Sequence, residues 1–266
     1  MIVEWNVHMF SADTARYPFH PRAKYTPKGL EPDPLAGYFE RMRTEGIDAA
    51  VLVHPEPYGD DHRLVRDCLA RDRERLRITS LFYPDDADAP AKLAALAAEE
   101  PLMISTRFHA VRGARSYFES FSDAGVRAIW AQAAALGLIV ELHIGPNFAA
   151  DAASLIREYP ETYVLIDHLA EPGRGDDAEY QDVLALAEYP NVLMKLSGLQ
   201  HFAKEPPLYP DALPLTKRVI AAFGPDKLVW GDGTPAIVDA HMQGYSDADR
   251  AKVKGDNLAK LLKFTR

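Results

Sequence analysis

Eight short apolar runs, each followed by a longer stretch with helical spacing, recur along the chain of 266 residues. The runs are rich in β-branched residues, which favours strands. The longer stretches carry helix start signals such as Ser122-Asp123 and Ser246-Asp247. Regular alternation of strands and helices is typical of parallel sheets with right-handed crossovers. Eight such units in this length predict an α/β fold, a (β/α)₈ TIM barrel that forms a single domain over residues 1–266.

The expected elements can be placed along the sequence. The predicted strands are 2–7, 48–53, 76–82, 102–108, 138–144, 162–168, 191–197 and 226–231. The predicted helices are 35–45, 60–74, 89–99, 122–136, 149–159, 177–188, 211–223 and 246–263. A doubly wound open sheet is the alternative, but no glycine-rich dinucleotide loop follows an early strand. Residues 9–34 form a long loop predicted to lie over the C-terminal face of the barrel.

Composition limits the partners of the chain. The formal net charge is −9 at pH 7, whereas nucleic-acid binding needs clustered lysine and arginine. No stretch reaches the roughly 20 apolar residues of a membrane-spanning helix. The N-terminal sequence lacks a secretory signal pattern, and Cys68 is the single cysteine, so an internal disulfide is impossible. We therefore expect a cytoplasmic protein that acts on a small molecule, with no nucleic-acid or membrane partner and with a homo-oligomer left open.

Polar residues gather at the predicted strand ends, where the active sites of such barrels lie. A histidine follows or ends six of the eight strands: His8, His54, His109, His143, His168 and His201. Arg107 lies near the end of the fourth strand, and Asp232 follows the eighth. One histidine in a loop is more often a satisfied polar residue than a functional one. Six that converge on one face predict a site.

Strand alternation predicts which of these residues face inward. On the first strand, Glu4, Asn6 and His8 are expected to face the barrel interior, and Trp5 the helices. A buried charge needs a partner, so Glu4 and Lys195 are expected to form a structural ion pair across the barrel.

Several of these stretches resemble the amidohydrolase superfamily, in the branch that holds L-fuconolactonase and 2-pyrone-4,6-dicarboxylate lactonase. They are VEWNVHMF (3–10), RYPFHPRAKYTP (16–27), STRFH (105–109), LIDHLAEP (165–172), NVLMKLSGL (191–199) and LVWGDGTP (228–235). The resemblance runs through the whole chain in order. It implies a TIM barrel that hydrolyses a small ring ester, often without a metal.

The chain departs from the pattern of this branch at two positions. Asn6 stands at the first histidine of the strand-one motif Asp-x-His-x-His. Gly233 stands at the usual aspartate after strand eight, and Asp232 comes one place earlier. A shift of one residue reverses the face of a strand, so strict alternation predicts that Asp232 points away from the barrel mouth. Gly231 and Gly233 could correct this through a bulge or a positive-φ turn; otherwise Asp232 is a turn cap.

The favoured function is a hydrolase that opens a small lactone or related cyclic ester with base-activated water. Asp232 is the predicted base, and His168 and His143 are predicted to polarise the carbonyl group or stabilise the oxyanion. The predicted substrate-binding residues are Arg107, Tyr25, His8, His201 and Asn6. Glu171 stands where the dicarboxylate lactonase has an arginine, so the resemblance implies a neutral or singly acidic ring.

Two other functions stay open. One is a metal-dependent hydrolase or decarboxylase of the same superfamily, with a divalent metal such as zinc on His8, His143, His168 and either Asp232 or Glu141. No cofactor is favoured, because Asn6 is a poor ligand for a transition metal. The other is a non-catalytic barrel that binds a ring compound, suggested by the departures at positions 6 and 233.

Overall fold

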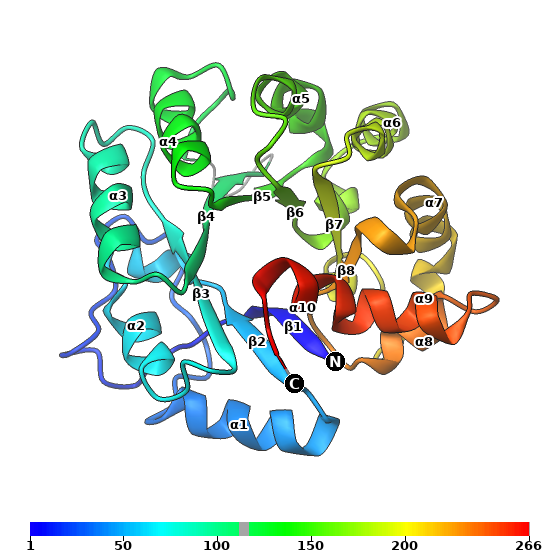
Figure 1. Cartoon of the computed structure of the whole chain (residues 1–266), viewed down its shortest axis with the longest axis horizontal. Helices are drawn as coiled ribbons and strands as arrows, with labels where there is room; N and C mark the ends of the chain where they lie inside the picture. Colours follow the sequence, from blue (N-terminus) through cyan, green and yellow to red (C-terminus); the bar gives the residue numbers. More distant parts are fainter. Residues whose placement is uncertain (112–116, 266) are drawn as a thin grey trace.

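Eight parallel strands form the centre of the molecule, in a computed structural model that describes residues 1–111 and 117–265. They pair in sequence order and form a nearly closed barrel surrounded by helices (Figure 1). The strands are β1 Val3–Val7, β2 Ala49–Leu52, β3 Leu76–Leu81, β4 Met103–Ala110, β5 Ile139–Ile144, β6 Val164–Ile166, β7 Val192–Leu196 and β8 Leu228–Trp230. The predicted TIM barrel is confirmed.

The helices lie outside the strands, and all but one of the predicted helices have a single counterpart. They are α1 Pro34–Glu45, α2 Arg63–Leu69, α3 Ala89–Glu99, α4 Ala124–Ala135, α5 Ala149–Glu158, α6 Asp177–Ala185, α7 Leu213–Phe223, α8 Ala236–His241, α9 Asp247–Ala251 and α10 Asn257–Leu262. The expected helix 246–263 is wrong in detail, because a π-helical segment separates α9 from α10. Gly255 in that segment lies against β1, where an added Cβ would come within 2.4 Å of the Val3 nitrogen.

Two apolar layers hold the barrel together. The inner layer is made of strand residues and is closed at the N-terminal end by α10, which lies beside both termini in Figure 1. Its members include Val3, Trp5, Val51, Leu165, Leu193, Val229, Leu258 and Leu262. The outer layer packs the other strand faces against the helices. Each fully buried large apolar side chain contributes roughly 1.5–3 kcal/mol to the stability of the fold.

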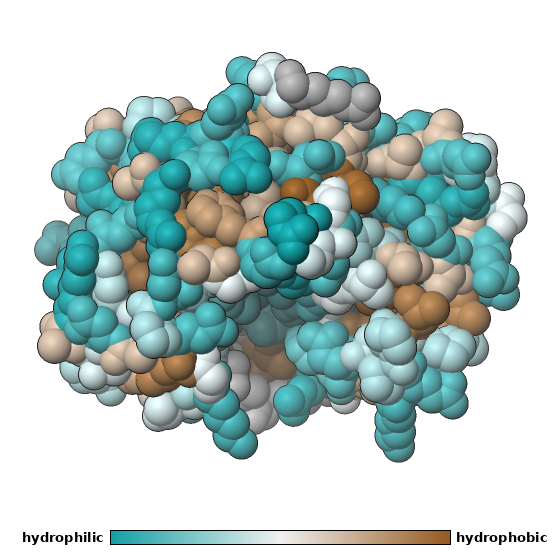
Figure 2. All heavy atoms as spheres, turned by 90° about the horizontal axis from the view of Figure 1, so that it is seen from below, coloured by the Kyte–Doolittle hydropathy of each residue, from teal (hydrophilic) through white to brown (hydrophobic). Residues whose placement is uncertain are grey.

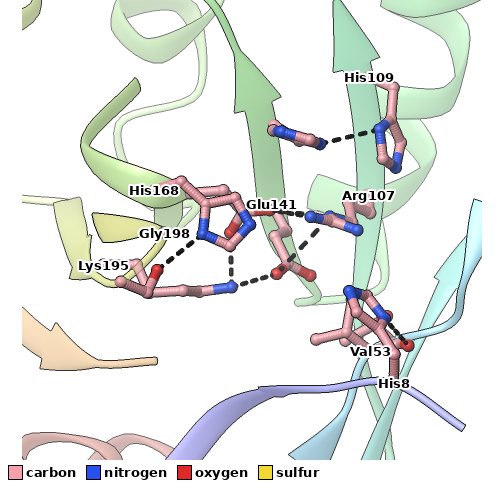
Figure 3. Close-up of polar contacts among 12 residues, drawn as sticks. His8, Val53, Arg107, His109, Glu141, His168, Lys195 and Gly198 are labelled. Atoms are coloured by element: carbon pink, nitrogen blue, oxygen red, sulfur yellow. Dashed lines mark hydrogen bonds and ion pairs between the residues drawn. The ribbon is translucent and has the colours of Figure 1, made fainter. Parts of the chain in front are cut away.

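A bulge in β1 corrects the predicted faces of the first strand. The pairing of β1 with β2 is regular up to Trp5 and shifts before Val7. Trp5 lies inside the barrel, with Lys195 Nζ 5.7 Å from its ring centre, whereas Val7 packs in the outer layer. The expectation that Trp5 faces the helices is therefore wrong. Because the bulge reverses the alternation, His8 turns back into the barrel mouth, on the side of Arg107 (Figure 3).

Glu4 faces outward, so its predicted pair with Lys195 is wrong. Tyr38 donates a hydrogen bond of 2.8 Å to Glu4 Oε2, and Arg41 Nη1 donates one of 2.9 Å to Oε1. Both partners belong to α1. Burial still raises the pKa of Glu4 to about 7, against the lowering by Arg41 and Tyr38. The alternating pattern marked two faces of β1 but not which one is inward.

The surface is mainly polar on the face drawn in Figure 2. Hydrophilic residues predominate on the face in Figure 2, and hydrophobic ones occur there in small groups. Leu136 and Tyr163 are the exposed large hydrophobic residues of the described chain. Within those same residues, no helix has the length and apolar character needed to cross a membrane. The expected absence of a nucleic-acid partner stays a prediction, and so does the possible homo-oligomer.

Candidate active site

The strand ends bring most of the predicted histidines to one mouth of the barrel. His109 and His143 lie on β4 and β5, and His168 and His201 follow β6 and β7. A cavity of about 420 Å³, here called the mouth cavity, lies among them. It is lined by His109, Val111, His143, Glu171, Gly173, Arg174 and His201. This volume falls in the range of small-molecule sites. His54 lies apart from this group, buried against His62 with 4.3 Å between ring centres.

Four side chains of the mouth cavity form a continuous hydrogen-bonded chain. His109 Nδ1 and His143 Nδ1 are 3.0 Å apart, and His143 Nε2 lies 2.8 Å from Glu171 Oε1. His201 Nδ1 reaches the same oxygen at 2.9 Å. A carboxylate can only accept, so His143 Nε2 carries the proton, and neutral His143 accepts at Nδ1 from His109. The chain of bonds thus fixes the tautomers of both rings.

The charge states of the cavity follow from burial and these bonds. Burial lowers the pKa of His109, His143 and His168, so all three rings are neutral at pH 7. Burial also lowers the pKa of His201, but its hydrogen bond with Glu171 and the negative charges of Glu171 and Asp232 together raise it by more. Burial raises the pKa of Glu171, whereas the bonds from His143 and His201 hold it well below its usual range. The site therefore combines the neutral rings of His109, His143 and His168 with one firmly ionised carboxylate, and His201 is the imidazole whose pKa is raised.

Four buried charges, here called the ion network, lie below the histidines inside the barrel. Arg107 Nε and Nη2 are 2.8 and 2.6 Å from Asp167 Oδ2. Lys195 Nζ is 2.6 Å from Glu141 Oε1 and 2.5 Å from Asp167 Oδ1. None of the four residues is more than 4% exposed, and Figure 3 shows Arg107, Glu141 and Lys195 converging in the barrel. When all four groups are ionised, the two positive and two negative charges cancel.

The network sets the protonation of its own carboxyl groups. Burial raises the pKa of Glu141 to about 7, with Asp167 adding to the rise and Lys195 opposing it. Burial also acts upward on Asp167, but Arg107 and Lys195 hold its pKa well below the usual range. Burial lowers the pKa of Arg107, yet Asp167, Glu141 and the nearby Tyr25 raise it by more. Two of the three guanidinium nitrogens of Arg107 are committed to Asp167.

Asp232 does not point away from the mouth, because the chain turns sharply after β8. Its Oδ1 and Oδ2 accept hydrogen bonds of 3.0 and 3.2 Å from the Gly198 amide. The Trp230 indole donates to the Asp232 carbonyl at 2.7 Å, and Gly233 takes a φ of 74°. Asp232 lines a second cavity of about 460 Å³ together with Asn6 and His8. Of the two alternatives that the sequence left open, the structure has the positive-φ turn at Gly233 and not strict alternation of the strand.

Gly198 lies between Asp232 and His168. Its amide binds the Asp232 carboxylate, and a Cβ added to it would lie 2.6 Å from His168 Cβ. Its φ of 67° also favours glycine. Ser197 Oγ lies 2.9 Å from His168 Nδ1 and fixes the orientation of that ring. The loop after β7 therefore couples the acid after β8 to the histidine after β6.

Three of the mouth residues could hold a metal ion. Within the described part of the chain, ligand atoms of His143, His168 and Glu171 all lie within 4.8 Å of one another. The predicted set of His8, His143, His168 and Asp232 is thus gathered only in part, with Glu171 as the third ligand. His109 and Ser197 hydrogen-bond the two ligand rings, as outer-shell groups do in zinc sites. Two imidazoles and a carboxylate fit zinc with an open position.

Comparison with known proteins agrees with this architecture. The family model described as amidohydrolase matches residues 5–264. A 4-sulfomuconolactone hydrolase from Hydrogenophaga intermedia is 27% identical over 98% of this chain and 82% of its own length. An L-fucono-1,5-lactonase from Burkholderia ambifaria is 27% identical over 79% of this chain and 70% of its own.

A solved structure gives the same fold. A probable 2-pyrone-4,6-dicarboxylic acid hydrolase from Acinetobacter baumannii superposes with a TM-score of 0.80 at 19% identity, covering 99% of both chains. The predicted resemblance and the predicted hydrolase class are confirmed by these matches. The chain belongs to the amidohydrolase family.

Proposed function

We propose that this protein opens a small lactone with water, to give a hydroxy acid. The observation that carries the proposal is that Asp232 and His168 lie on either side of Gly198, and that the His168 ring is 5.2 Å from the ring of neutral His143, measured between ring centres. Two relatives whose names describe lactone hydrolysis add support. The cytoplasmic location and the single domain stay predictions.

In the proposed reaction, Asp232 takes a proton from water as the oxygen attacks the lactone carbonyl carbon. His168 stabilises the oxyanion that forms on the carbonyl oxygen, and His143, whose single N–H is bonded to Glu171, must give up that bond to do the same. When the ester bond breaks, the proton held by Asp232 passes to the ring oxygen, which leaves as a hydroxyl group. The product acid then releases its own proton to solvent. Tyr25, His8, His201 and Asn6 are proposed to line the substrate, as expected from the sequence.

Asp232 is favoured over Glu171 as the base. Glu171 Oε1 is occupied by two imidazoles, which keep its pKa low and make proton uptake costly. Asp232 is bound by one backbone amide and by Gln200, and no ion pair joins it to another described residue. Purified protein should acidify a weakly buffered solution of its lactone, as seen with a pH indicator. Absence of turnover across a broad lactone panel, with a folded sample, would refute the proposal.

The mouth cavity favours a ring with one acidic substituent. The cations of the ion network are neutralised inside the barrel, whereas Arg174 is exposed on the cavity wall. Among the ion pairs of the described residues, none includes Arg174. We therefore propose that Arg174, rather than Arg107, meets the substrate anion, and that Arg107 acts through the network.

Arg174→Gln should raise KM for an acidic lactone about 5- to 30-fold, since one charge-assisted hydrogen bond contributes roughly 1–2 kcal/mol. KM for a neutral lactone of the same ring size should stay within twofold. Steady-state kinetics on the matched pair of lactones measure both values. Arg157→Gln, an exposed change away from the mouth, is the control. An equal rise in KM for both lactones would show that Arg174 does not bind the substrate anion.

A second candidate is a metal-dependent hydrolase or decarboxylase, favoured by the grouping of His143, His168 and Glu171. A bound divalent metal would polarise the carbonyl group and lower the pKa of a bound water. His143 and His168 would hold it through their ring nitrogens and Glu171 through a carboxylate oxygen.

Calorimetric titration of chelator-treated protein with zinc tests this second candidate. Binding at about one equivalent is expected, and Glu171→Gln should weaken it roughly 10- to 100-fold, because a ligand charge is lost. Glu100→Gln, which removes a buried carboxylate bound to Arg73 outside the mouth, should leave it unchanged. No measurable heat with zinc, together with full activity in chelator, would exclude the metal-dependent function.

A further inference from the structure

Four consecutive residues after β6 are left-handed, although none is glycine. The φ angles of His168, Leu169, Ala170 and Glu171 are 50°, 55°, 57° and 48°. L-residues visit this region mostly as single residues, because Cβ then crowds the following carbonyl oxygen. A whole left-handed turn persists only where its surroundings determine it. We call this segment the left-handed turn.

The turn aims both of its terminal side chains at one point. His168 opens it and Glu171 closes it, and their ligand atoms lie within 4.8 Å of that of His143. Leu169 and Ala170, between them, are fully buried in the outer apolar layer. The apolar middle is therefore anchored in the core, while the polar ends face the mouth.

Backbone bonds alone do not account for the position of the turn. The Ala170 amide donates to the Asp167 carbonyl at 2.8 Å, and the Glu171 amide to the His168 carbonyl at 3.0 Å. These bonds close the turn on itself. Tyr180 of α6 adds a tie from outside, because its hydroxyl donates to the Leu169 carbonyl at 2.9 Å. Tyr180 is 3% exposed, so little water competes for this bond.

We propose that the left-handed turn is a strained positioning device and that Tyr180 is the positioning residue that holds it. The hydroxyl of Tyr180 ties the turn to α6, so that His168 and Glu171 keep their separation and direction. Tyr180 acts through these two residues and does not touch the mouth cavity. The catalytic part of this inference rests on the proposed lactone hydrolysis, whereas the strain and the tie do not.

Tyr180→Phe tests the tie, since only the hydroxyl is lost. We expect kcat to fall about tenfold or more, with KM within twofold, because catalytic groups lose effect steeply when misplaced. Amide hydrogen exchange of residues 168–171, followed by mass spectrometry, should become faster. Tyr17→Phe is the control: its hydroxyl donates to Asp67 at 2.7 Å, away from the turn, so kcat and exchange at 168–171 should not change.

Ala170→Gly tests the strain, because glycine adopts positive φ without penalty. Loss of strain offsets loss of the buried methyl group, so the melting temperature should stay within about 1 °C of wild type. Ala133→Gly is the matched control: Ala133 is equally buried but lies in right-handed α4, and its change should lower the melting temperature by about 2–4 °C.

The outcomes separate the inference from the proposed function. Equal losses in the two glycine variants would show that the turn carries no strain, and unchanged exchange in Tyr180→Phe would show that the hydroxyl does not hold it. Either result overturns the inference, as does a Tyr180→Phe enzyme with normal kcat. If the wild type opens no lactone, the proposed function fails, but the exchange and melting experiments still decide on the tie and the strain.

Discussion

Asp232→Asn is expected to lower kcat about 10²- to 10⁴-fold, the usual contribution of a general base. The amide keeps the shape of the carboxylate and can still accept a hydrogen bond from the Gly198 amide through its oxygen. It cannot take a proton from water. Because asparagine also suits such turns, the melting temperature should change little. Stopped-flow or steady-state hydrolysis of the wild-type substrate gives the rate, and thermal unfolding confirms the fold.

Glu171→Gln is the comparison that locates the base. If Asp232→Asn retains wild-type turnover while Glu171→Gln loses 10²-fold or more, the base is Glu171 and the assignment of Asp232 is wrong. The double variant Asp232→Ser with Gly233→Asp would move the acid to the position that is usual in the family, but it should not restore activity. Gly233 has a φ of 74°, and an added Cβ would lie 2.6 Å from Ile237 Cδ1. We expect that double variant to be destabilised.

Lys195→Met is expected to lower the free energy of unfolding by about 3–5 kcal/mol, since it leaves a buried charge without its partner. Methionine fills a similar volume, so the loss reports on charge more than on packing. Glu141 and Asp167 would then share Arg107 alone. Most domains have a total stability of about 5–15 kcal/mol, so this variant should be marginal at 25 °C. Urea unfolding followed by fluorescence measures the change.

The double variant Lys195→Met with Glu141→Gln should recover about 1–3 kcal/mol, because it restores neutrality with Arg107 and Asp167 still paired. The pH dependence has a definite sign. Burial already raises the pKa of Glu141 from 4.5 to about 7, and loss of Lys195 raises it further. A raised carboxyl pKa costs stability as pH rises above the unfolded value. Both folded states hold the Glu141 proton well below pH 7, so the difference between Lys195→Met and wild type should shrink mainly as pH falls from about 9 to about 6. A constant difference over that range would contradict this account.

The architecture and the location of the site could be predicted from sequence. The eight strand–helix units gave the barrel, and reading strand ends found His143 and His168. Asp167 was missed, although alternation along the sixth predicted strand would have placed it with Leu165 on the inner face.

Other features had no sequence signal. The bulge in β1 contains no glycine, yet it decides that His8 reaches the mouth although Glu4, before the bulge, faces α1. The place of Glu171 beside His143 depends on a left-handed turn built from ordinary residues. Both are imposed by packing around them, and local propensity points the other way. Such conflicts between local preference and the fold are expected at functional sites.

The ion network also limits how this protein can change over evolutionary time. Each of Arg107, Glu141, Asp167 and Lys195 is tolerable inside the barrel only while the total charge stays near zero. A protein with one of these residues replaced by a neutral one would have low stability, because a buried charge is left unpaired. A protein in which two residues of opposite charge are replaced together would not. Across an alignment of relatives, these four columns should therefore covary, with opposite charges gained and lost together.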